Sequence, residues 1–453
     1  MSITKLFDIS RQSLLAFKTA IDVSSQNVAN STNPNYTRQR VLFATVGAEN
    51  FKRGILGGGV AIQDVLRVRN ELTDIQIRNY NSKFNEQDKR SEYLAQVESL
   101  FIEPNELGMG SVLNSFFNSW NELAVTPNSQ VLRGKVIDSA RLLSSKISSL
   151  NDGFKTVKTQ ALNEAKGLVD KLNQYIQEIQ QLNKEIFLGK NAENNVAHLM
   201  DKRDEVMDEI SKIANINYTI DNQGTFVLSI GGVFASDIYK LNQFELVEKN
   251  GKLALKTVDG DAYVNLNSGS LYGILNTYND RIPHYQNRLD EFVVALMNSV
   301  NDLHSRGYTL HQSPATGVNF FSAYENGKLI INENILQDPN YIAASANGES
   351  GDGSIALQIF DLSARKDILN NKTFFDNYAD IVTDLAREKS LNDKSQETNQ
   401  IILQSLERQK ANYIGVSIDE EMTNIIAYQK AYEASAKLVS VADQMLKTLI
   451  NAV

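Results

Sequence analysis

Two stretches at opposite ends of the chain place apolar residues alternately four and three positions apart. This alternation is typical of a coiled-coil seam, and so narrow a stripe needs a second helix to cover it. The pattern predicts two terminal helices that pack against each other; the alternative is two ordinary core helices that happen to be terminal. The N-terminal row consists of Ile3, Phe7, Ser10, Leu14, Phe17, Ile21, Ser24 and Val28. The C-terminal row consists of Ile418, Met422, Ile425, Gln429, Tyr432, Ala436, Val439, Asp443, Leu446, Ile450 and Val453.

A turn is predicted directly after the first helix, at Asn33-Pro34-Asn35-Tyr36. Pro34 presets φ for the second position of a turn, and Asn35 tolerates a positive φ at the third. The chain is therefore expected to fold back after its first helix.

The residues around this turn resemble the N-terminal signature of the axial proteins of the bacterial flagellum. Asn33 and Asn35 stand where that family usually has Thr and Gly. The residues that fit are Ala29, Asn30, Pro34, Tyr36, Thr37, Arg38 and Gln39. Independently, Asp419-Glu420-Glu421 and the stretch Tyr428 to Lys437 resemble the C-terminal helix of the hook-associated protein 1 family, at the hook-filament junction.

The interior of the chain alternates between helical and strand-like patterns. Strands are expected at Val41 to Val46 and Val60 to Val68, around the glycine loop Gly54 to Gly59, which lacks the spacing of a phosphate-binding loop. Strand-like alternation returns from Ile216 to Leu266, and Arg306 to Leu362 is irregular and strand-like. Helices are expected at Glu71 to Phe101, Ser111 to Val125, Val196 to Ala214, Tyr272 to Asn301 and Phe374 to Tyr413.

The longest regular pattern steps by four and three from Val136 to Ile186, with one four-four step at Ala161 that resembles a stutter. A helix over this range would span about 75 Å at ~1.5 Å per residue, so the molecule is expected to be elongated. Gly153 and Gly167 are expected to weaken the helix and mark bends.

The predicted fold is multidomain and mainly α, with small β-rich insertions and a nested order. Residues 1–45 and 412–453 form the paired terminal helices of an inner domain. Residues 46–215, 271–304 and 363–411 form a long-helix domain further in along the chain. Residues 216–270 are a β-rich insertion, and residues 305–362 are an irregular β-rich segment; both are expected to lie distally.

Composition narrows the class of protein. The 453 residues suffice for several domains, and 42% hydrophobic and 22% charged residues describe a folded chain. A net charge of -9 argues against a nucleic-acid surface, and no apolar run approaches the ~20 residues of a membrane helix. The absence of cysteine excludes disulfides and thiolate metal sites. The N-terminus lacks the pattern of a cleaved signal, which on composition alone indicates the cytosol.

No catalytic or metal-binding constellation is visible. His198, His284, His304 and His311 show no metal-ligand spacing. Gly348 to Asp352 comes close to a nucleophile elbow but has Asp352 where the second glycine belongs, so a turn is the better interpretation. Asp201-Lys202-Arg203-Asp204 is interpreted as a salt-bridge array on a helix surface rather than an ion site. We predict a non-enzyme without metal or cofactor.

The resemblance implies a structural subunit that joins the flagellar hook to the filament, exported through the type III apparatus and located outside the cell. Implied partners are further copies in a ring, the hook protein, a second junction protein, and an export chaperone on the C-terminal helix. The alternatives are another axial protein, hook or rod, or a secreted enzyme using the central domains. The predicted assembly interface consists of Ile3, Phe7, Leu14, Phe17, Ile21, Val28, Asn30, Pro34, Tyr36, Arg38, Gln39, Met422, Ile425, Tyr428, Gln429, Tyr432, Ala436, Val439 and Leu446.

Overall fold

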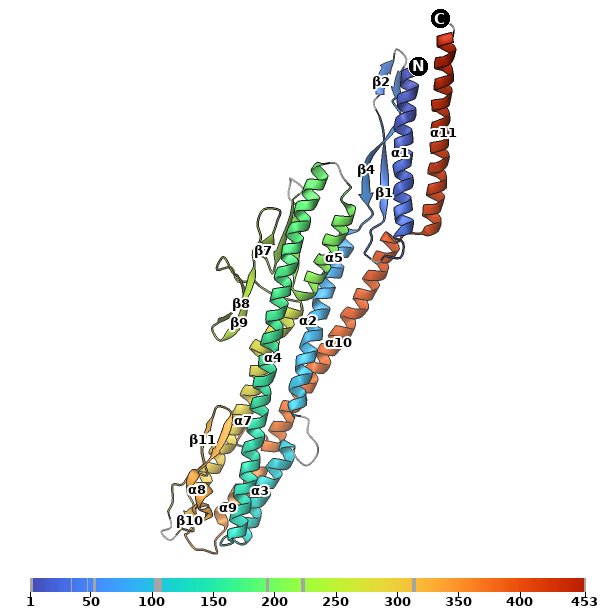
Figure 1. Ribbon diagram of the computed structural model, residues 1–453. Helices are drawn as coiled ribbons and strands as arrows, with labels where there is room; N and C mark the ends of the chain where they lie inside the picture. Colours follow the sequence, from blue (N-terminus) through green and yellow to red (C-terminus); the bar gives the residue numbers. More distant parts are fainter. Residues whose placement is uncertain are drawn as a thin grey trace. The chain divides into compact units, whose positions relative to one another are not determined.

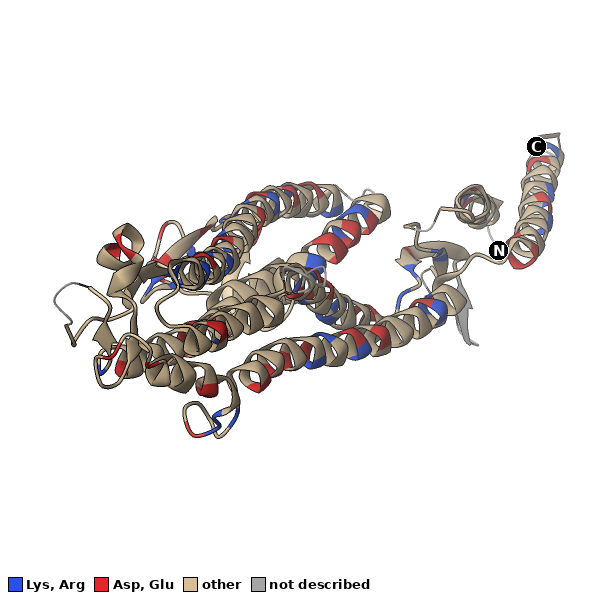
Figure 2. Cartoon of the chain, turned by 90° about the horizontal axis from the view of Figure 1, so that it is seen from below, with Lys and Arg blue, Asp and Glu red and all other residues tan. Residues whose placement is uncertain are grey.

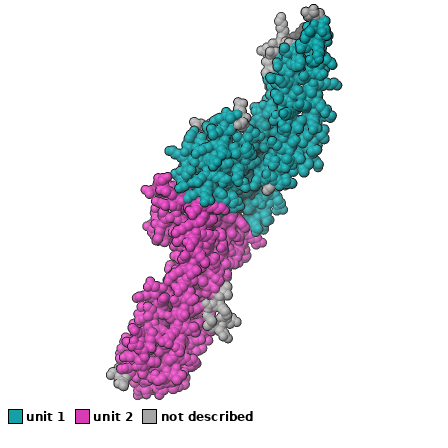
Figure 3. All heavy atoms as spheres, in the orientation of Figure 1, with its two compact units in different colours: residues 1–81, 172–243, 399–453 teal, residues 82–171, 244–398 magenta. Residues whose placement is uncertain are grey.

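The computed structural model describes residues 3–33, 35–46, 48–51, 54–101, 108–192, 195–220, 225–311 and 315–451. The chain divides into two compact units, shown in Figure 3. Unit 1 comprises residues 1–81, 172–243 and 399–453, and unit 2 comprises residues 82–171 and 244–398. Three of the four unit boundaries fall within α2 (Glu71–Phe101), α4 (Gln130–Asn191) and α10 (Phe374–Ile414), so each of these helices contributes to both units. The four-part division drawn from sequence remains a prediction.

Unit 1 contains both ends of the chain. Helix α1 (Ile3–Ala29) lies beside α11 (Ile418–Asn451), as Figure 1 shows. Strand β1 (Gln39–Thr45) pairs antiparallel with β4 (Val60–Arg67), which confirms the predicted hairpin. The pairing continues through β2 (Ala48–Phe51) and β3 (Gly54–Gly57), so the first four residues of the expected glycine loop form a strand instead. A partner strand was available there, and ladder hydrogen bonds outweigh the weak strand preference of glycine.

The rest of unit 1 joins a small sheet to helices. Strands β5 (Ile216–Ile220), β6 (Phe226–Ile230) and β7 (Val233–Ser236) form one antiparallel sheet after α5 (Ala197–Ile213). Tyr218 stacks on Phe226 at 5.3 Å between ring centroids, and the Arg203 guanidinium lies 4.1 Å from the centre of the Phe226 ring. These contacts hold the sheet on α5. The predicted turn at residues 221–224 lies outside the described residues.

Unit 2 is built around buried aromatic side chains on α3 (Met109–Val125), α7 (Ile282–His304) and α10. Three antiparallel pairs accompany these helices: β8 (Phe244–Lys249) with β9 (Lys252–Thr257), β10 (Tyr308–Thr309) with β13 (Ala343–Ser345), and β11 (Phe321–Glu325) with β12 (Lys328–Ile331). Short helices α8 (Glu333–Gln337) and α9 (Ser354–Asp361) complete the irregular segment, where no helix was predicted. The buried aromatic residues include Phe116, Phe117, Trp120, Phe292, Phe320, Phe321 and Phe374.

The seam predicted along α4 is buried almost throughout, and the helix is longer than predicted. The exceptions are Leu168 and Tyr175, which are half-buried while their neighbours Val169 and Ile176 are buried. This change of phase follows the four-four step at Ala161, as a stutter requires. The helix is continuous at Gly153 and Gly167. A side chain at Gly153 would meet Leu100, so this glycine permits close helix packing.

One predicted helix is interrupted. Between α6 (Ser270–Asn276) and α7 the chain makes a π-helical turn, Thr277–Arg281, in which the Ile282 amide donates to the Thr277 carbonyl. Pro283 lacks the N–H that would bond the carbonyl of Asn279, so the regular ladder cannot continue. The side chain of Asn279 instead pairs with both backbone groups of Leu253 on β9 at 2.8 Å each.

Charged residues of both signs are interspersed along the helices (Figure 2). Among the described residues, no helix combines the length and apolar content that crossing a membrane requires.

Candidate assembly interface

Helices α1 and α11 pack through small side chains. The buried residues of α11 are Glu421, Ser435 and Ala442, and those of α1 are Ser10, Ser13, Ala16, Ala20, Val23, Ser24 and Asn27. Small side chains allow two helix backbones to approach closely. The buried hydroxyls cost little, because Ser10 donates to the Leu6 carbonyl at 2.7 Å and Ser435 to the Ala431 carbonyl at 2.9 Å. The buried part of this contact is therefore weakly apolar.

The large residues of the predicted C-terminal seam lie beside this contact rather than in it. Met422 is 46% exposed and Leu446 is 41% exposed, and Gln429, Tyr432 and Ala436 are also exposed. Ile425, Tyr428 and Val439 are half-buried. Only part of this seam is covered, because the buried residues of α11, Glu421, Ser435 and Ala442, lie on a neighbouring row. We use the name outer face of α11 for its exposed large apolar side chains taken together, which lie on more than one side of the helix: Ile418, Met422, Ile426, Tyr432, Leu438, Val441, Met445, Leu446, Leu449 and Ile450.

The large residues of the α1 seam are half-buried. They are Ile3, Phe7, Leu14, Phe17, Ile21 and Val28. Phe17 belongs to a chain of rings in which Phe43 of β1 lies 5.9 Å from Phe17 and 5.9 Å from Tyr428 of α11. This chain brings α1, the hairpin and α11 together. At the other end of the pair, Ile3 and residues of α11 from Val441 to Leu449 line a groove of about 520 Å³.

The segment after α1 is organised by a residue that the sequence analysis missed. Asn27 is fully buried; its amide donates to the Gln39 carbonyl at 2.8 Å, and its carbonyl accepts from the Gln39 amide at 2.9 Å and the Tyr36 hydroxyl at 2.8 Å. Burial, with the charge of Asp201 second, raises the pKa of Tyr36 to about 12, so this hydroxyl remains a donor. The sequence signal that could have identified Asn27 is its position, as a polar residue, on the buried side of the first helix.

Of the predicted turn residues, Gln39 is buried, Tyr36 and Arg38 are half-buried, and Asn30 is half-buried and bonds the Gln26 carbonyl at 2.9 Å. Pro34 lies outside the described residues. The Asn33 side chain accepts from the Asn35 amide at 3.1 Å, the local bond that makes Asn favourable in turns.

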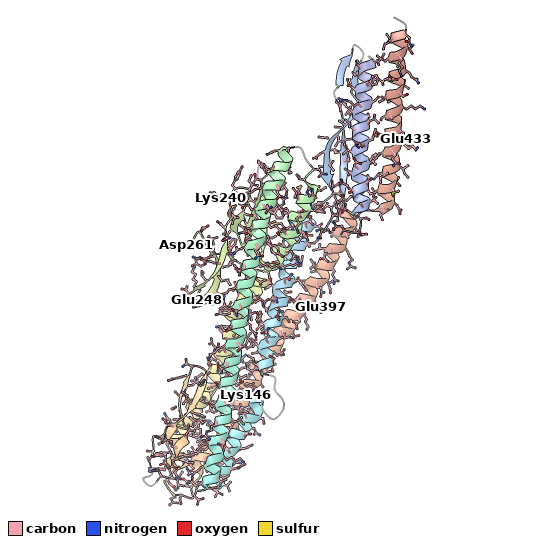
Figure 4. The ribbon with its side chains drawn as sticks, viewed as in Figure 1. Lys146, Lys240, Glu248, Asp261, Glu397 and Glu433 are labelled. Atoms are coloured by element: carbon pink, nitrogen blue, oxygen red, sulfur yellow. The ribbon has the colours of Figure 1, made fainter. Side chains whose placement is uncertain are left out.

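Arg38 ties the hairpin to the start of α11. Its guanidinium lies 2.7 Å from the carboxylate of Glu421 and 2.9 Å from that of Glu420. Glu421 is only 2% exposed, so Arg38 compensates a buried charge there. The hydrogen bond and charge of Arg38 lower the pKa of the more exposed Glu420. Both acids lie in the first turn of α11, where negative charge is favourable. Further along the helix, the exposed pair Lys430–Glu433, with Glu433 labelled in Figure 4, adds little stability.

Replacing Asn27 by alanine is expected to lower the free energy of unfolding of the hairpin by about 1–3 kcal/mol, because both backbone groups of Gln39 lose their partner in a buried place. Amide exchange at Gln39 should accelerate accordingly. The control is Asn30→Ala, which removes one more accessible bond and should change exchange little. Equal exchange at Gln39 in the two variants would contradict the role given to Asn27.

The histidines form no common site. His198 and His284 are exposed, His311 stacks on Tyr341 at 4.9 Å, and His304 is fully buried. No group of acidic residues and histidines within the described ranges could hold a metal ion.

Comparison with known proteins gives a consistent set of relatives. The family model described as flagellar hook-associated protein FlgK helical domain matches residues 94–321, and that described as flagellar basal body rod FlgEFG protein C-terminal matches residues 412–452. Flagellar hook-associated protein 1 of Bacillus subtilis (strain 168) is 26% identical, over 98% of this chain and 97% of that protein. The protein of the same name from Salmonella typhimurium is 22% identical, over 99% of this chain and 100% of that protein.

A solved structure shows a similar fold. The flagellar hook junction protein FlgK from Burkholderia pseudomallei superimposes with a TM-score of 0.63 at 12% sequence identity, covering 74% of this chain and 99% of that chain.

Proposed function

The chain belongs to the family of the flagellar hook-associated protein FlgK, and from this premise we propose that it assembles at the hook-filament junction through α1 and the outer face of α11. The family confirms the resemblance found in the sequence: the protein is a structural component of the bacterial flagellum. It is not a family of enzymes.

The observation that carries the proposal is the outer face of α11. Monomers rarely leave so many large apolar side chains exposed along one helix, and such surfaces mark interaction sites. A helix with an uncovered seam can bury it against the helices of neighbouring subunits, as coiled coils do. Each Å² of apolar surface removed from water contributes about 25 cal/mol of favourable free energy. Covering Met422 and Leu446 in an assembly would therefore favour association.

We further propose that neighbouring copies form a ring, and that the hook protein and a second junction protein contact its two sides. Before assembly, the same outer face needs protection from aggregation, so an export chaperone would bind α11. Export through the flagellar type III apparatus and an extracellular location follow from the proposed place in the flagellum.

The test is a strain that lacks this protein. Electron micrographs are expected to show hooks without filaments, and motility should return when the wild-type chain is supplied. Hooks that carry normal filaments in the deletion strain would contradict the junction role. A strain without hooks would indicate the alternative axial role, hook or rod.

A further inference from the structure

Two segments of unit 1 that lie more than a hundred residues apart in sequence meet in one ion network. Arg67, at the end of β4, and Arg69 contact α5 through Asp201 and Asp204. Arg69 also bonds Asp74 of α2 at 2.6 Å, and Lys410 of α10 bonds the same carboxylate at 2.9 Å. The network therefore joins the base of the hairpin to three helices. The predicted helix-surface array at Asp201 to Asp204 is thus a tertiary cluster instead.

Asp204 is the centre of this network. Its carboxylate accepts from Arg67, from Arg69 and, at 3.3 Å, from Arg78 of α2. Arg78 also bonds Asp208, one helical turn further along α5, at 2.6 Å. One carboxylate on α5 thereby holds three guanidinium groups that come from β4, the following loop and α2.

The inner part of the network is largely removed from solvent, although Asp204 itself is 18% exposed. The side chains of Arg78 and Asp74 are 4% exposed, and those of Arg67 and Asp201 are 10% exposed. Burial lowers the pKa of Arg67 and of Arg69. A buried ion pair is weak evidence for stability, but loss of one partner leaves an uncompensated buried charge. Fixing one geometry is the better-attested use of such groups.

A fourth arginine, Arg203, lies near the three that Asp204 binds. The adjacent Arg203 is buried, and its guanidinium donates to the side-chain oxygen of Asn183 at 3.0 Å; among the described residues it forms no ion pair with a carboxylate. Burial, followed by the charges of Arg67, Arg69 and Arg78, lowers the pKa of Arg203 to about 10. Asp204 therefore offsets the repulsion among neighbouring arginines.

The same network leads directly to the terminal helices. Asp201 accepts from the Thr37 amide at 3.2 Å, and Gln39 is the register partner of Arg67 at the base of the hairpin. Gln39 in turn bonds Asn27 of α1, and Arg38 bonds Glu421 of α11. A continuous series of contacts thus runs from α5 through the hairpin base to both α1 and α11.

We propose that Asp204 is a positioning residue for assembly. By holding Arg67, Arg69 and Arg78 together, it fixes the terminal hairpin on α2 and α5, so that α1 and α11 meet neighbouring subunits in one orientation. This inference rests on the proposed function of the terminal helices. The cluster does not act as a cation site, because every carboxylate in it already faces a guanidinium or ammonium group.

The test compares Asp204→Asn with Glu205→Gln in the full chain. Both remove one negative charge from neighbouring residues of α5, but Glu205 is 40% exposed and pairs with the exposed Lys202. The chain has no cysteine, so Lys184→Cys on α4 and Lys437→Cys on α11, both exposed, can carry a pair of spin labels. Double electron-electron resonance then measures the distribution of distances between the two labels, on α4 and α11 of unit 1.

Asp204→Asn is expected to broaden this distance distribution in the monomer and to reduce incorporation at hook ends about tenfold or more, equivalent to about 1.4 kcal/mol. Glu205→Gln should match the wild type in both measurements. A narrow distribution together with normal incorporation for Asp204→Asn would overturn the proposal. A broad distribution with unchanged incorporation would overturn the link to assembly.

If the single variant does not fold, the double variant Asp204→Asn, Arg69→Gln replaces it in the distance measurement. This variant removes one negative and one positive charge, so the net charge of the cluster is unchanged. It should still give a broad distribution, because Arg67 and Arg78 lose their common acceptor; a narrow one would overturn the proposal. Failure of the proposed function itself would appear differently. The wild type would then have a narrow distance distribution but fail to incorporate at hook ends.

Discussion

Replacing both Met422 and Leu446 by glutamate is expected to abolish assembly while the monomer remains folded. Both side chains belong to the outer face of α11 and are 46% and 41% exposed, so the isolated chain loses little packing. In an assembly the new carboxylates would lie at apolar contacts between subunits, where an unpaired charge is expensive to bury. Complementation of the deletion strain should give no filaments, and circular dichroism of the purified variant should match the wild type.

The matched control places the same two charges at polar positions of the same helix, as Thr423→Glu with Ser440→Glu. Both positions are exposed, and this variant should restore filaments. Amide exchange adds a second measurement. Residues 418–450 should exchange more slowly in assemblies than in the dilute monomer, because the exposed large apolar side chains of α11 become covered only when subunits associate. Equal protection of α11 in the monomer and in assemblies, or filaments from the Met422, Leu446 variant, would contradict the proposed role of the outer face.

Helical periodicity was sufficient to locate the long helices, because their seams repeat over many turns. The range Glu71 to Phe101 was predicted with the bounds that α2 has, and the seam of α4 is buried nearly as predicted. The same logic located only part of the contact between α1 and α11. A search for seams weights large apolar residues, whereas this contact uses Ser10, Ala20, Ser435 and Ala442, whose value lies in allowing close approach.

The pairings that organise unit 1 could not be found from sequence. Asp204 reads as one of several charges on a polar helix, and its partners Arg67, Arg69 and Arg78 lie far from it along the chain. Only the fold brings them within bonding distance and removes them from water. Asn27 was missed for a related reason: a helix-interior Asn is usually exposed, and only the returning hairpin makes it a buried partner for Gln39.

Acid is expected to destabilise unit 2 through His304, between pH 6.5 and about 4. The fully buried ring lies close to the Val318 carbonyl (Nδ1 to oxygen, 2.7 Å) and accepts at Nε2 from the Ala343 amide at 2.8 Å. The carbonyl can only accept and the amide can only donate, so the neutral Nδ1–H tautomer is required. Protonation at Nε2 would place the new N–H opposite the Ala343 N–H, so that neither donor would have an acceptor. Burial, together with the buried Arg133, lowers the pKa of His304 to about 4.

Proton linkage gives the direction in which stability changes with pH. Between these two pH values the unfolded chain binds a proton that the folded chain excludes, so stability is full above pH 6.5 and falls as the pH decreases towards 4. The lost free energy of unfolding amounts to about 3 kcal/mol. Asp352 affects stability at lower pH than His304. Burial alone would raise the pKa of Asp352, but hydrogen bonds from Ser354, Ala346 and Ser345 outweigh burial and lower the pKa to about 2.

His304→Gln separates this effect from general acid unfolding. The variant should be less stable than the wild type at pH 7, since glutamine reproduces only part of the bonding, but it should lose the additional pH dependence between 6.5 and 4. The control His284→Gln changes an exposed residue of the same helix and should keep the wild-type dependence. Amide exchange at Ala343, followed against pH in the full chain, measures the opening directly. Equal pH dependence at Ala343 in all three proteins would show that another group controls it.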